Sequence, residues 1–215
     1  PMASVDGRYV LVYNGELYNF RELRTHLEAN GCRFKTRSDT EVILQAFIFW
    51  GERCVDHFNG MFAFAIWDKQ QHQISLVRDR LGKKPLYYSL EGSELVFGSE
   101  LSSLYPFKKW DHTIDRQALA SFLVFGYVPD PHSIYQAVSK LLPGNIATID
   151  LAGNVTIKPY WKLDQYVFDH DGRAKKQLFS DVEAIEQAHE LVRDSVSRRM
   201  MADVPVGVFL SGGLD

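Results

Sequence analysis

Cysteine and long apolar runs are both scarce in this sequence. Of its 215 residues only two are cysteines, Cys32 and Cys54, and they lack CxxC spacing. A disulfide framework is therefore excluded, and a reducing cytoplasm is the simplest location. The longest apolar run, Met61–Trp67, has the length of a strand and falls far short of the roughly 20 residues that span a membrane. We expect no membrane partner.

Charge of one sign is also lacking. The formal net charge is -3, and no block of basic residues stands out. This argues against nucleic acid and acidic membrane surfaces as partners. Hydrophobic residues make up 46% of the chain and charged residues 24%, which is typical of a globular protein that buries a core without covalent cross-links. A chain of this length has room for one or two domains.

Neither end of the sequence has the features of a natural chain terminus. The chain begins with Pro1-Met2-Ala3, without a helix-capping residue or a charged residue, and it ends inside a motif that is typical of a loop. We interpret it as an internal piece of a longer protein.

Periodicity predicts an α+β fold. Helices are expected at 20–29, 42–50, 117–125 and 181–201, and strands at 9–13, 33–35, 61–68, 74–77, 85–89, 95–99, 146–150, 155–158 and 205–210. The strands describe a mostly antiparallel sheet system flanked by two helical layers. The polar stretch 165–180 is typical of a linker. We therefore expect a first domain over 1–164 and the start of a second over 181–215.

The first strand reaches the dipeptide Asn14-Gly15, which readily adopts positive φ. A hairpin turn is the usual interpretation of Asn-Gly, but a hairpin needs a second strand directly after it. Here a helix follows, with Asn19 as its N-cap and Glu22 at capping-box spacing. The pattern predicts a sharp corner between strand and helix. Such a corner can aim a backbone N–H and an amide side chain at one point, as an oxyanion site requires.

A second motif, Ser211-Gly212-Gly213-Leu214-Asp215, follows the predicted last strand. Glycines after a strand let backbone N–H groups face a phosphate, and a following helix N-terminus adds to the attraction. A plain turn is the alternative for Gly-Gly alone. The order strand–SGGxD resembles the pyrophosphate loop of the ATP pyrophosphatases, which implies ATP and Mg²⁺ as cofactors. The resemblance places Leu210, Ser211, Gly212, Gly213 and Asp215 at the nucleotide, with Mg²⁺ shared by Asp215 and phosphate oxygens.

Further motifs occur upstream in a fixed order. They are Asn14-Gly15-Glu16, Ser38-Asp39, Gly60 to Ala65, Arg78 to Tyr88 and Gly98-Ser99-Glu100. Each has a structural alternative; Arg78 to Leu86, for example, reads equally well as a charged turn between strands. Together they resemble the glutaminase domain of class II glutamine amidotransferases. With SGGLD downstream, the whole chain resembles the B-type glutamine-hydrolysing asparagine synthetases.

This resemblance implies a four-layer αββα sandwich of the N-terminal-nucleophile hydrolase type, followed by the start of an α/β ATP-pyrophosphatase domain. It also implies a homodimer. Asn14 and Gly15 would form the oxyanion hole, and Glu16 would lie in the glutamine pocket. Asp39 would bind the α-ammonium group of glutamine, although a plain helix N-terminal charge is the alternative for this residue.

The sequence also departs from the family pattern. The family nucleophile is a cysteine at residue one of the mature chain, whereas Pro1 matches a point some tens of residues further on. Cys32 and Cys54 are better interpreted as buried structural thiols. We predict that the whole protein makes asparagine from aspartate, ATP and glutamine-derived ammonia, and that this chain alone is inactive. The alternatives are an amidotransferase for a β-lactam or sugar carboxylate, a glutamine-binding module, and, last, a phosphoribosyl amidotransferase.

Overall fold

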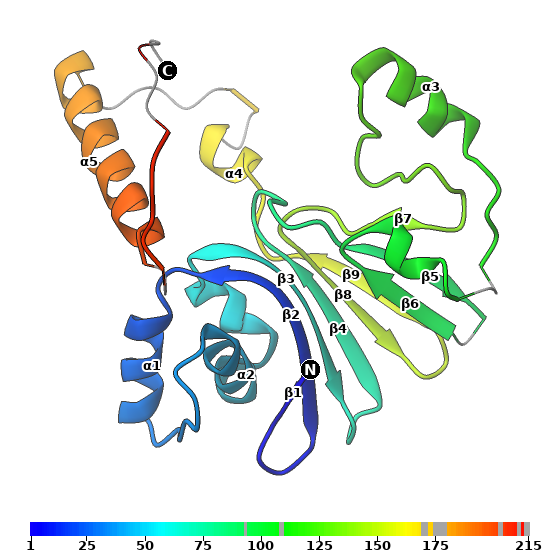
Figure 1. The fold of residues 1–215 in the computed structure, drawn as a ribbon, viewed down its shortest axis with the longest axis horizontal. Coiled ribbons are helices and arrows are strands. Elements are labelled where there is room, and N and C mark those ends of the chain that lie inside the picture. Colours follow the sequence, from blue (N-terminus) through cyan, green and yellow to red (C-terminus); the bar gives the residue numbers. More distant parts are fainter. Residues whose placement is uncertain are drawn as a thin grey trace. The chain divides into compact units, whose positions relative to one another are not determined.

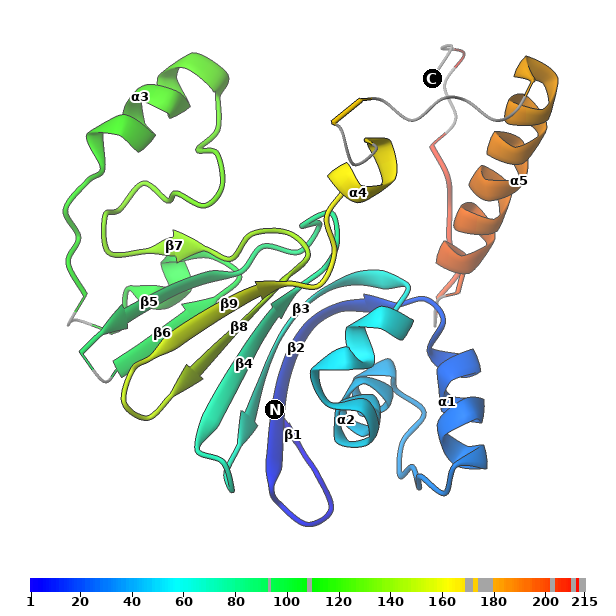
Figure 2. The same cartoon turned by 180° about the vertical axis from the view of Figure 1, so that it is seen from behind.

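The structure is a computed structural model that describes residues 1–92, 94–107, 110–168, 172–173, 180–201, 204–209 and 212. These residues belong to two compact units, Pro1–Leu163 and Asp164–Asp215, which we describe separately. Figures 1 and 2 show the elements of both units from opposite sides. In the described ranges, no helix is both long and apolar enough to cross a membrane.

The first unit contains two antiparallel sheets. The larger sheet has the strand order β1 (Met2–Ala3), β2 (Tyr9–Leu17), β3 (Gly60–Asp68), β4 (Gln73–Arg78), β8 (Asn145–Asp150) and β9 (Val155–Pro159). The smaller sheet has the order β6 (Glu94–Gly98), β5 (Tyr87–Glu91) and β7 (Ser139–Lys140). All strand pairs in both sheets are antiparallel, as the sequence predicts.

One face of the larger sheet is covered by α1 (Phe20–Ala29), α2 (Asp39–Trp50) and the 3-10 segment η1 (Gly51–His57), as Figure 1 shows. Ser38 is the N-cap of α2, and its side chain accepts a hydrogen bond from the Glu41 N–H, as expected for a serine at this position. The main hydrophobic core lies between these helices and the sheet; among its fully buried side chains are Leu11, Leu27, Ile43, Phe62 and Phe64.

The other face of the larger sheet packs against the smaller sheet. Small side chains of the larger sheet, including Ala63 and Ala65, meet larger ones such as Tyr88 and Phe97 from the smaller sheet. The outer face of the smaller sheet carries a third cluster, which contains Trp110 and Leu104 of the 3-10 segment η2 (Leu101–Leu104). Helix α3 (Arg116–Phe125) lies beyond this face, and most of its apolar side chains are exposed. The packed layers therefore follow the order helix, sheet, sheet, with η2 on the outer face of the smaller sheet, and the predicted α+β class is confirmed.

The second unit contains α4 (Asp164–Val167) and α5 (Asp181–Arg199). Helix α5 begins with a capping box, in which Ser180 and Glu183 each bond the other's backbone N–H. The strand predicted at 205–210 is not formed in its described part: residues 204–209 have no regular structure and are exposed, and Leu210 lies outside the described residues. The reason is that a buried strand needs a neighbour, and the described part of this unit contains no strand to pair with it.

Candidate functional site

Strand β2 does not stop at Asn14-Gly15, so the predicted corner is wrong. The strand continues to Leu17, and its pairing with β3 is unbroken: Asn14 lies opposite Ala63, and Gly15 lies opposite Phe62. Cross-strand pairing therefore overrides the turn preference of Asn-Gly, which is a local effect. The turn into α1 follows at residues 18–19 instead.

Asn19 occupies the predicted N-cap position of α1, but its side chain makes no capping hydrogen bond. Its amide instead donates to the His57 carbonyl at 2.9 Å and accepts from the Asn59 N–H at 3.0 Å. The predicted capping box is therefore wrong at this helix. The Asn19 side chain joins the turn before α1 to the segment that leads into β3.

The backbone of Gly15 faces the open edge of β2. Its partner, Phe62, uses both backbone groups on the β4 side: its carbonyl accepts from the Asp79 N–H at 2.8 Å, and its N–H donates to the Asp79 carboxylate at 3.2 Å. In an antiparallel ladder both backbone groups of a residue point the same way, so Gly15 and Phe62 form a non-hydrogen-bonded pair. The Gly15 N–H therefore points away from β3. On that side β1 reaches only Val10 and Leu11, so no strand of the described residues pairs with the edge beside Gly15.

Close approach of the backbones explains why position 15 is glycine. A Cβ atom at this position would lie 2.2 Å from the Met61 carbonyl oxygen and 2.7 Å from the Phe62 Cα. Gly60 has the same restriction from the opposite strand, since its Cβ would lie 2.3 Å from the Glu16 carbonyl oxygen. Strands β2 and β3 are therefore in close contact where the candidate oxyanion N–H lies.

The side chains of Asn14 and Glu16 lie on the face of β2 that looks toward the smaller sheet, because Asn14 pairs with Ala63 of the inter-sheet cluster. Both residues are exposed. The Asn14 amide nitrogen donates a hydrogen bond of 2.9 Å to the Ser99 hydroxyl, which follows directly after β6. The structure thus joins two of the sequence motifs through one hydrogen bond between the sheets.

Asp39 is the first residue of α2, and its carboxylate reaches the same strand. Its Oδ2 accepts from the Tyr13 hydroxyl at 2.9 Å and from the Leu17 N–H at 3.0 Å, while its Oδ1 accepts from the Thr40 hydroxyl at 3.4 Å. Burial, and next the nearby Asp39 carboxylate, raise the pKa of Tyr13, so its phenol stays protonated and donates. Oδ1, with one long contact, has capacity for a further donor such as an ammonium group.

The Leu17 N–H and the Gly15 N–H lie on the same edge of β2, because residues two apart in a strand point their backbone groups the same way. The Asp39 carboxylate therefore sits along the edge from the Gly15 N–H, at a spacing of about 7 Å for two residues of an antiparallel strand. A carboxylate for a cation and a donor for an oxyanion are thus arranged on one strand edge, with the Asn14 amide beside them.

The Arg78-Asp79 pair organises loops and does not face this edge. Asp79, which is only 2% exposed, accepts hydrogen bonds from four backbone N–H groups, those of Phe62, Leu81, Lys83 and Lys84. Arg78 is equally buried and donates to the carbonyls of Lys84, Gly82 and Leu141 and to the Asp130 carboxylate at 2.7 Å. Arg78 and Asp79 therefore have a structural role, since their side chains hold the surrounding loops together.

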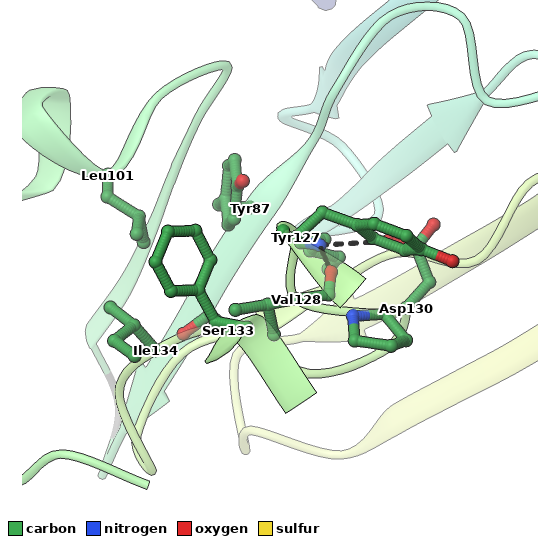
Figure 3. A pocket seen from close by; sticks show the side chains of 11 residues that line it. Tyr87, Leu101, Tyr127, Val128, Asp130, Ser133 and Ile134 are labelled. Atoms are coloured by element: carbon green, nitrogen blue, oxygen red, sulfur yellow. Dashed lines mark hydrogen bonds and ion pairs between the residues drawn. The ribbon is translucent and has the colours of Figure 1, made fainter. Parts of the chain in front are cut away.

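A cleft of about 590 Å³ lies on the outer side of the smaller sheet (Figure 3). Its lining includes Tyr87, Tyr127 and Asp130, and the Asp130 carboxylate is bridged to Lys140 at 3.1 Å as well as to Arg78. None of the four residues predicted to bind glutamine lines this cleft. It is therefore separate from the candidate site.

Neither cysteine lies in a setting that favours a thiolate. Cys54 is fully buried in the main core, and burial raises the pKa of its thiol. Burial also raises the pKa of Cys32, which follows the end of α1 and is half-buried. Because the thiolate is the nucleophilic form, both observations support the interpretation of these residues as structural thiols.

The predicted pyrophosphate loop lies almost wholly outside the described residues. This applies to Leu210, Ser211, Gly213 and Asp215; Gly212 is described and exposed, with open space where a Cβ atom would project. Across the described part of the chain, no group of three metal-ligating side chains comes together. The fit of ATP and Mg²⁺ to this loop therefore remains a prediction.

Sequence reasoning missed two residues of the site, Tyr13 and Ser99. Nothing in the sequence marked Tyr13 as a functional residue, because an aromatic residue in a strand usually belongs to the hydrophobic core. Ser99 belongs to a motif that was recognised, but nothing local gave it a partner. Both contribute through contacts with residues distant in sequence.

The chain is similar to known glutamine amidotransferases and asparagine synthases. Residues 1–161 match the family model of the glutamine amidotransferase domain, and residues 187–215 match that of asparagine synthase. Two relatives from Bacillus subtilis (strain 168), glutamine-hydrolyzing asparagine synthetases 3 and 1, are each 38% identical over 100% of this chain. The chain covers 34% and 32% of these relatives, so it spans about a third of their length.

A solved structure supports the fold of the first unit. The glutamine phosphoribosylpyrophosphate amidotransferase from B. subtilis, complexed with ADP and GMP, superimposes with a TM-score of 0.51 at 22% sequence identity. The match covers 74% of this chain and 31% of that one. The family match over residues 1–161 is decisive: the chain belongs to the glutamine amidotransferase domain family.

Proposed function

We propose that this chain forms the glutamine-binding part of a glutamine-hydrolysing asparagine synthetase. The observation that carries the proposal is the edge of β2, where the Leu17 N–H that holds the Asp39 carboxylate lies two residues along the strand from the outward-facing Gly15 N–H. In glutamine the α-nitrogen and the amide carbon are separated by four single bonds, roughly 5 Å when extended. A glutamine lying along this edge brings its ammonium group to Asp39 and its amide carbonyl toward Gly15.

The residues then have separate roles. Asp39 binds the α-ammonium through Oδ1, while Tyr13 and Leu17 hold Oδ2 and fix the carboxylate. When a cysteine thiolate attacks the amide carbon, the carbonyl oxygen becomes an oxyanion, and the Asn14 amide and the Gly15 N–H donate to it. The proton released from the thiol passes to the amide nitrogen, which leaves as ammonia as the tetrahedral intermediate collapses to a thioester; water then hydrolyses the thioester to glutamate and the free thiol. We assign the nucleophile to neither Cys32 nor Cys54.

The second reaction of the proposed enzyme uses the ammonia. ATP would activate the carboxylate of aspartate with release of pyrophosphate, and ammonia would displace AMP to form the amide. The match of residues 187–215 to asparagine synthase supports this half of the proposal. We place Leu210, Ser211, Gly212, Gly213 and Asp215 at the pyrophosphate, with Mg²⁺ supplying charge neutralisation there. Other acceptor carboxylates remain the alternative, and pyrophosphate release with a panel of carboxylates distinguishes them.

The test is Asp39→Asn in the whole protein. Asparagine keeps the size and one acceptor but removes the negative charge, so the charge-assisted bond to the ammonium group weakens. A loss of about 1.5–3 kcal/mol corresponds to a KM for glutamine that is roughly 10-fold to 150-fold higher. Amide formation with free ammonium chloride should not change, because that reaction does not need the glutamine site.

Asp181→Asn is the matched control, since Asp181 is also the first residue of a helix but is exposed in the second unit. It should leave both activities unchanged. An unchanged KM for glutamine in Asp39→Asn would refute the assignment of Asp39. If the wild-type protein used ammonium but not glutamine, glutamine hydrolysis itself would be refuted.

A further inference from the structure

We propose that Ser99 is a positioning residue that sets the orientation of the Asn14 carboxamide. This inference rests on the proposed function, in which that amide stabilises the oxyanion. The Asn14 Nδ2 donates to the Ser99 Oγ at 2.9 Å, and the two residues come from different sheets and lie 85 positions apart in the sequence. A hydroxyl from the smaller sheet thus fixes a side chain of the larger one.

The orientation matters because a carboxamide has two opposite ends. Nδ2 carries two N–H donors, whereas Oδ1 is an acceptor with negative partial charge. A half-turn about the Cβ–Cγ bond would replace a donor by an acceptor, and the acceptor would repel an oxyanion. In the orientation that the structure shows, the Ser99 Oγ accepts one of the two N–H groups, and the second N–H remains for the substrate. Because Asn14 is exposed, its side chain would otherwise sample both orientations.

The backbone that presents Ser99 is held on both sides. Before it, Gly98 ends the β5–β6 ladder opposite Tyr87. After it, the Glu100 carbonyl accepts from the Ser103 hydroxyl at 2.6 Å and from the Ser103 N–H at 3.2 Å. A Cβ atom at Gly98 would lie 2.1 Å from the Ser103 Oγ, so the turn closes tightly around that hydroxyl. The backbone on both sides of Ser99 is therefore held in place, which keeps its hydroxyl within reach of Asn14.

The experiment compares Ser99→Ala, Ser99→Thr and Ser102→Ala in the whole protein. Loss of an oxyanion donor costs about 10²-fold to 10³-fold in kcat, and loss of its orientation should cost part of that, about 10-fold to 100-fold for Ser99→Ala. The KM for glutamine should change by less than about two-fold, because the ground-state carbonyl hardly uses this donor. Ammonium-dependent amide formation should be unchanged, and Ser99→Thr, which keeps the hydroxyl, should restore most of the kcat.

Ser102→Ala is the matched control, because the Ser102 hydroxyl contacts the Glu100 carboxylate in the same segment and not Asn14. It should behave like the wild type. An unchanged kcat in Ser99→Ala, a change confined to KM, or an equal loss of ammonium-dependent activity would each overturn the positioning role. Absence of glutamine hydrolysis in the wild type would instead overturn the proposed function.

A readout independent of activity uses the 215-residue chain and nuclear magnetic resonance of the Asn14 side-chain amide. With Ser99 in place, one of the two amide protons should be protected from exchange with water. Ser99→Ala should remove that protection and shift both proton resonances, while Ser102→Ala should leave them in place. Identical Asn14 amide signals in the wild type and Ser99→Ala would refute the hydrogen bond on which the proposal rests.

Discussion

Gly15→Ala tests whether the close approach of β2 and β3 defines the site. The added methyl group would lie 2.2 Å from the Met61 carbonyl oxygen, which is a backbone atom and cannot rotate away. The strands must therefore separate locally. Because Gly15 and Phe62 form a non-hydrogen-bonded pair, the flanking pairs, Asn14 with Ala63 and Glu16 with Met61, carry the ladder hydrogen bonds that separation weakens.

The magnitude follows from those four bonds. Each contributes a net free energy of about 1 kcal/mol, so weakening them by half or more lowers the free energy of unfolding by about 2–4 kcal/mol. For a chain of this size a change of 1 kcal/mol shifts Tm by about 2–4 °C, so we expect Gly15→Ala to lower Tm by roughly 4–16 °C. Thermal unfolding of the purified chain, followed by circular dichroism, measures this shift.

Two further variants, one parallel change and one control, test the same explanation. Gly60→Ala should lower Tm by a similar amount, because its Cβ atom would meet the Glu16 carbonyl oxygen from the opposite strand. Gly207→Ala should leave Tm unchanged, since open space surrounds that position. If Gly15→Ala melted within about 2 °C of the Gly207→Ala control, below the shift expected for 1 kcal/mol, the close approach would be wrong.

Three more predictions follow from the described contacts. Asp79→Asn should lower the free energy of unfolding in urea by about 1–6 kcal/mol, because an amide nitrogen cannot accept and the two N–H groups that one carboxylate oxygen binds lose their partner; a loss under about 1 kcal/mol would contradict the structural role of Asp79. Hydrogen bonds from Arg8 hold the pKa of Asp68 at about 2. The stability that this pair contributes is therefore complete above about pH 4 and is lost as the pH falls toward 2. The Tm of Asp68→Asn should depend less on pH in that window than the Tm of the wild type, and an equal dependence would show that the pair does not contribute to it. Replacing Cys32 or Cys54 by serine should leave the kcat for glutamine hydrolysis by the whole protein unchanged, and abolition of hydrolysis by either change would identify the nucleophile we have excluded.

Local pattern was sufficient for most elements. The nearly continuous apolar run of β3 predicted a strand buried on both faces, and the structure places Phe62 and Phe64 in the helix-side core and Ala63 and Ala65 between the sheets. The predicted helix at 20–29 is α1 to the residue. Where prediction failed, at the Asn14-Gly15 corner, at the short strand 33–35 and at residues 205–209, the outcome depended on whether a partner strand was present, which local propensity does not encode.

The sequence by itself determined the two sheets with their helices, the family motifs and the two residue types of the proposed glutamine site, an amide at position 14 and a carboxylate at position 39. Only the tertiary structure decided how they act together. The register of β2 on β3 turns the Gly15 N–H to the open edge, the packing of α2 brings Asp39 to the Leu17 N–H on that edge, and the packing of the two sheets brings Ser99 to Asn14. The physical reason is that the periodicity of apolar residues shows which side of a helix or strand is buried, but not which strand it pairs with. A hydrogen bond between residues 85 positions apart, such as Asn14 and Ser99, depends on the register and packing of whole strands.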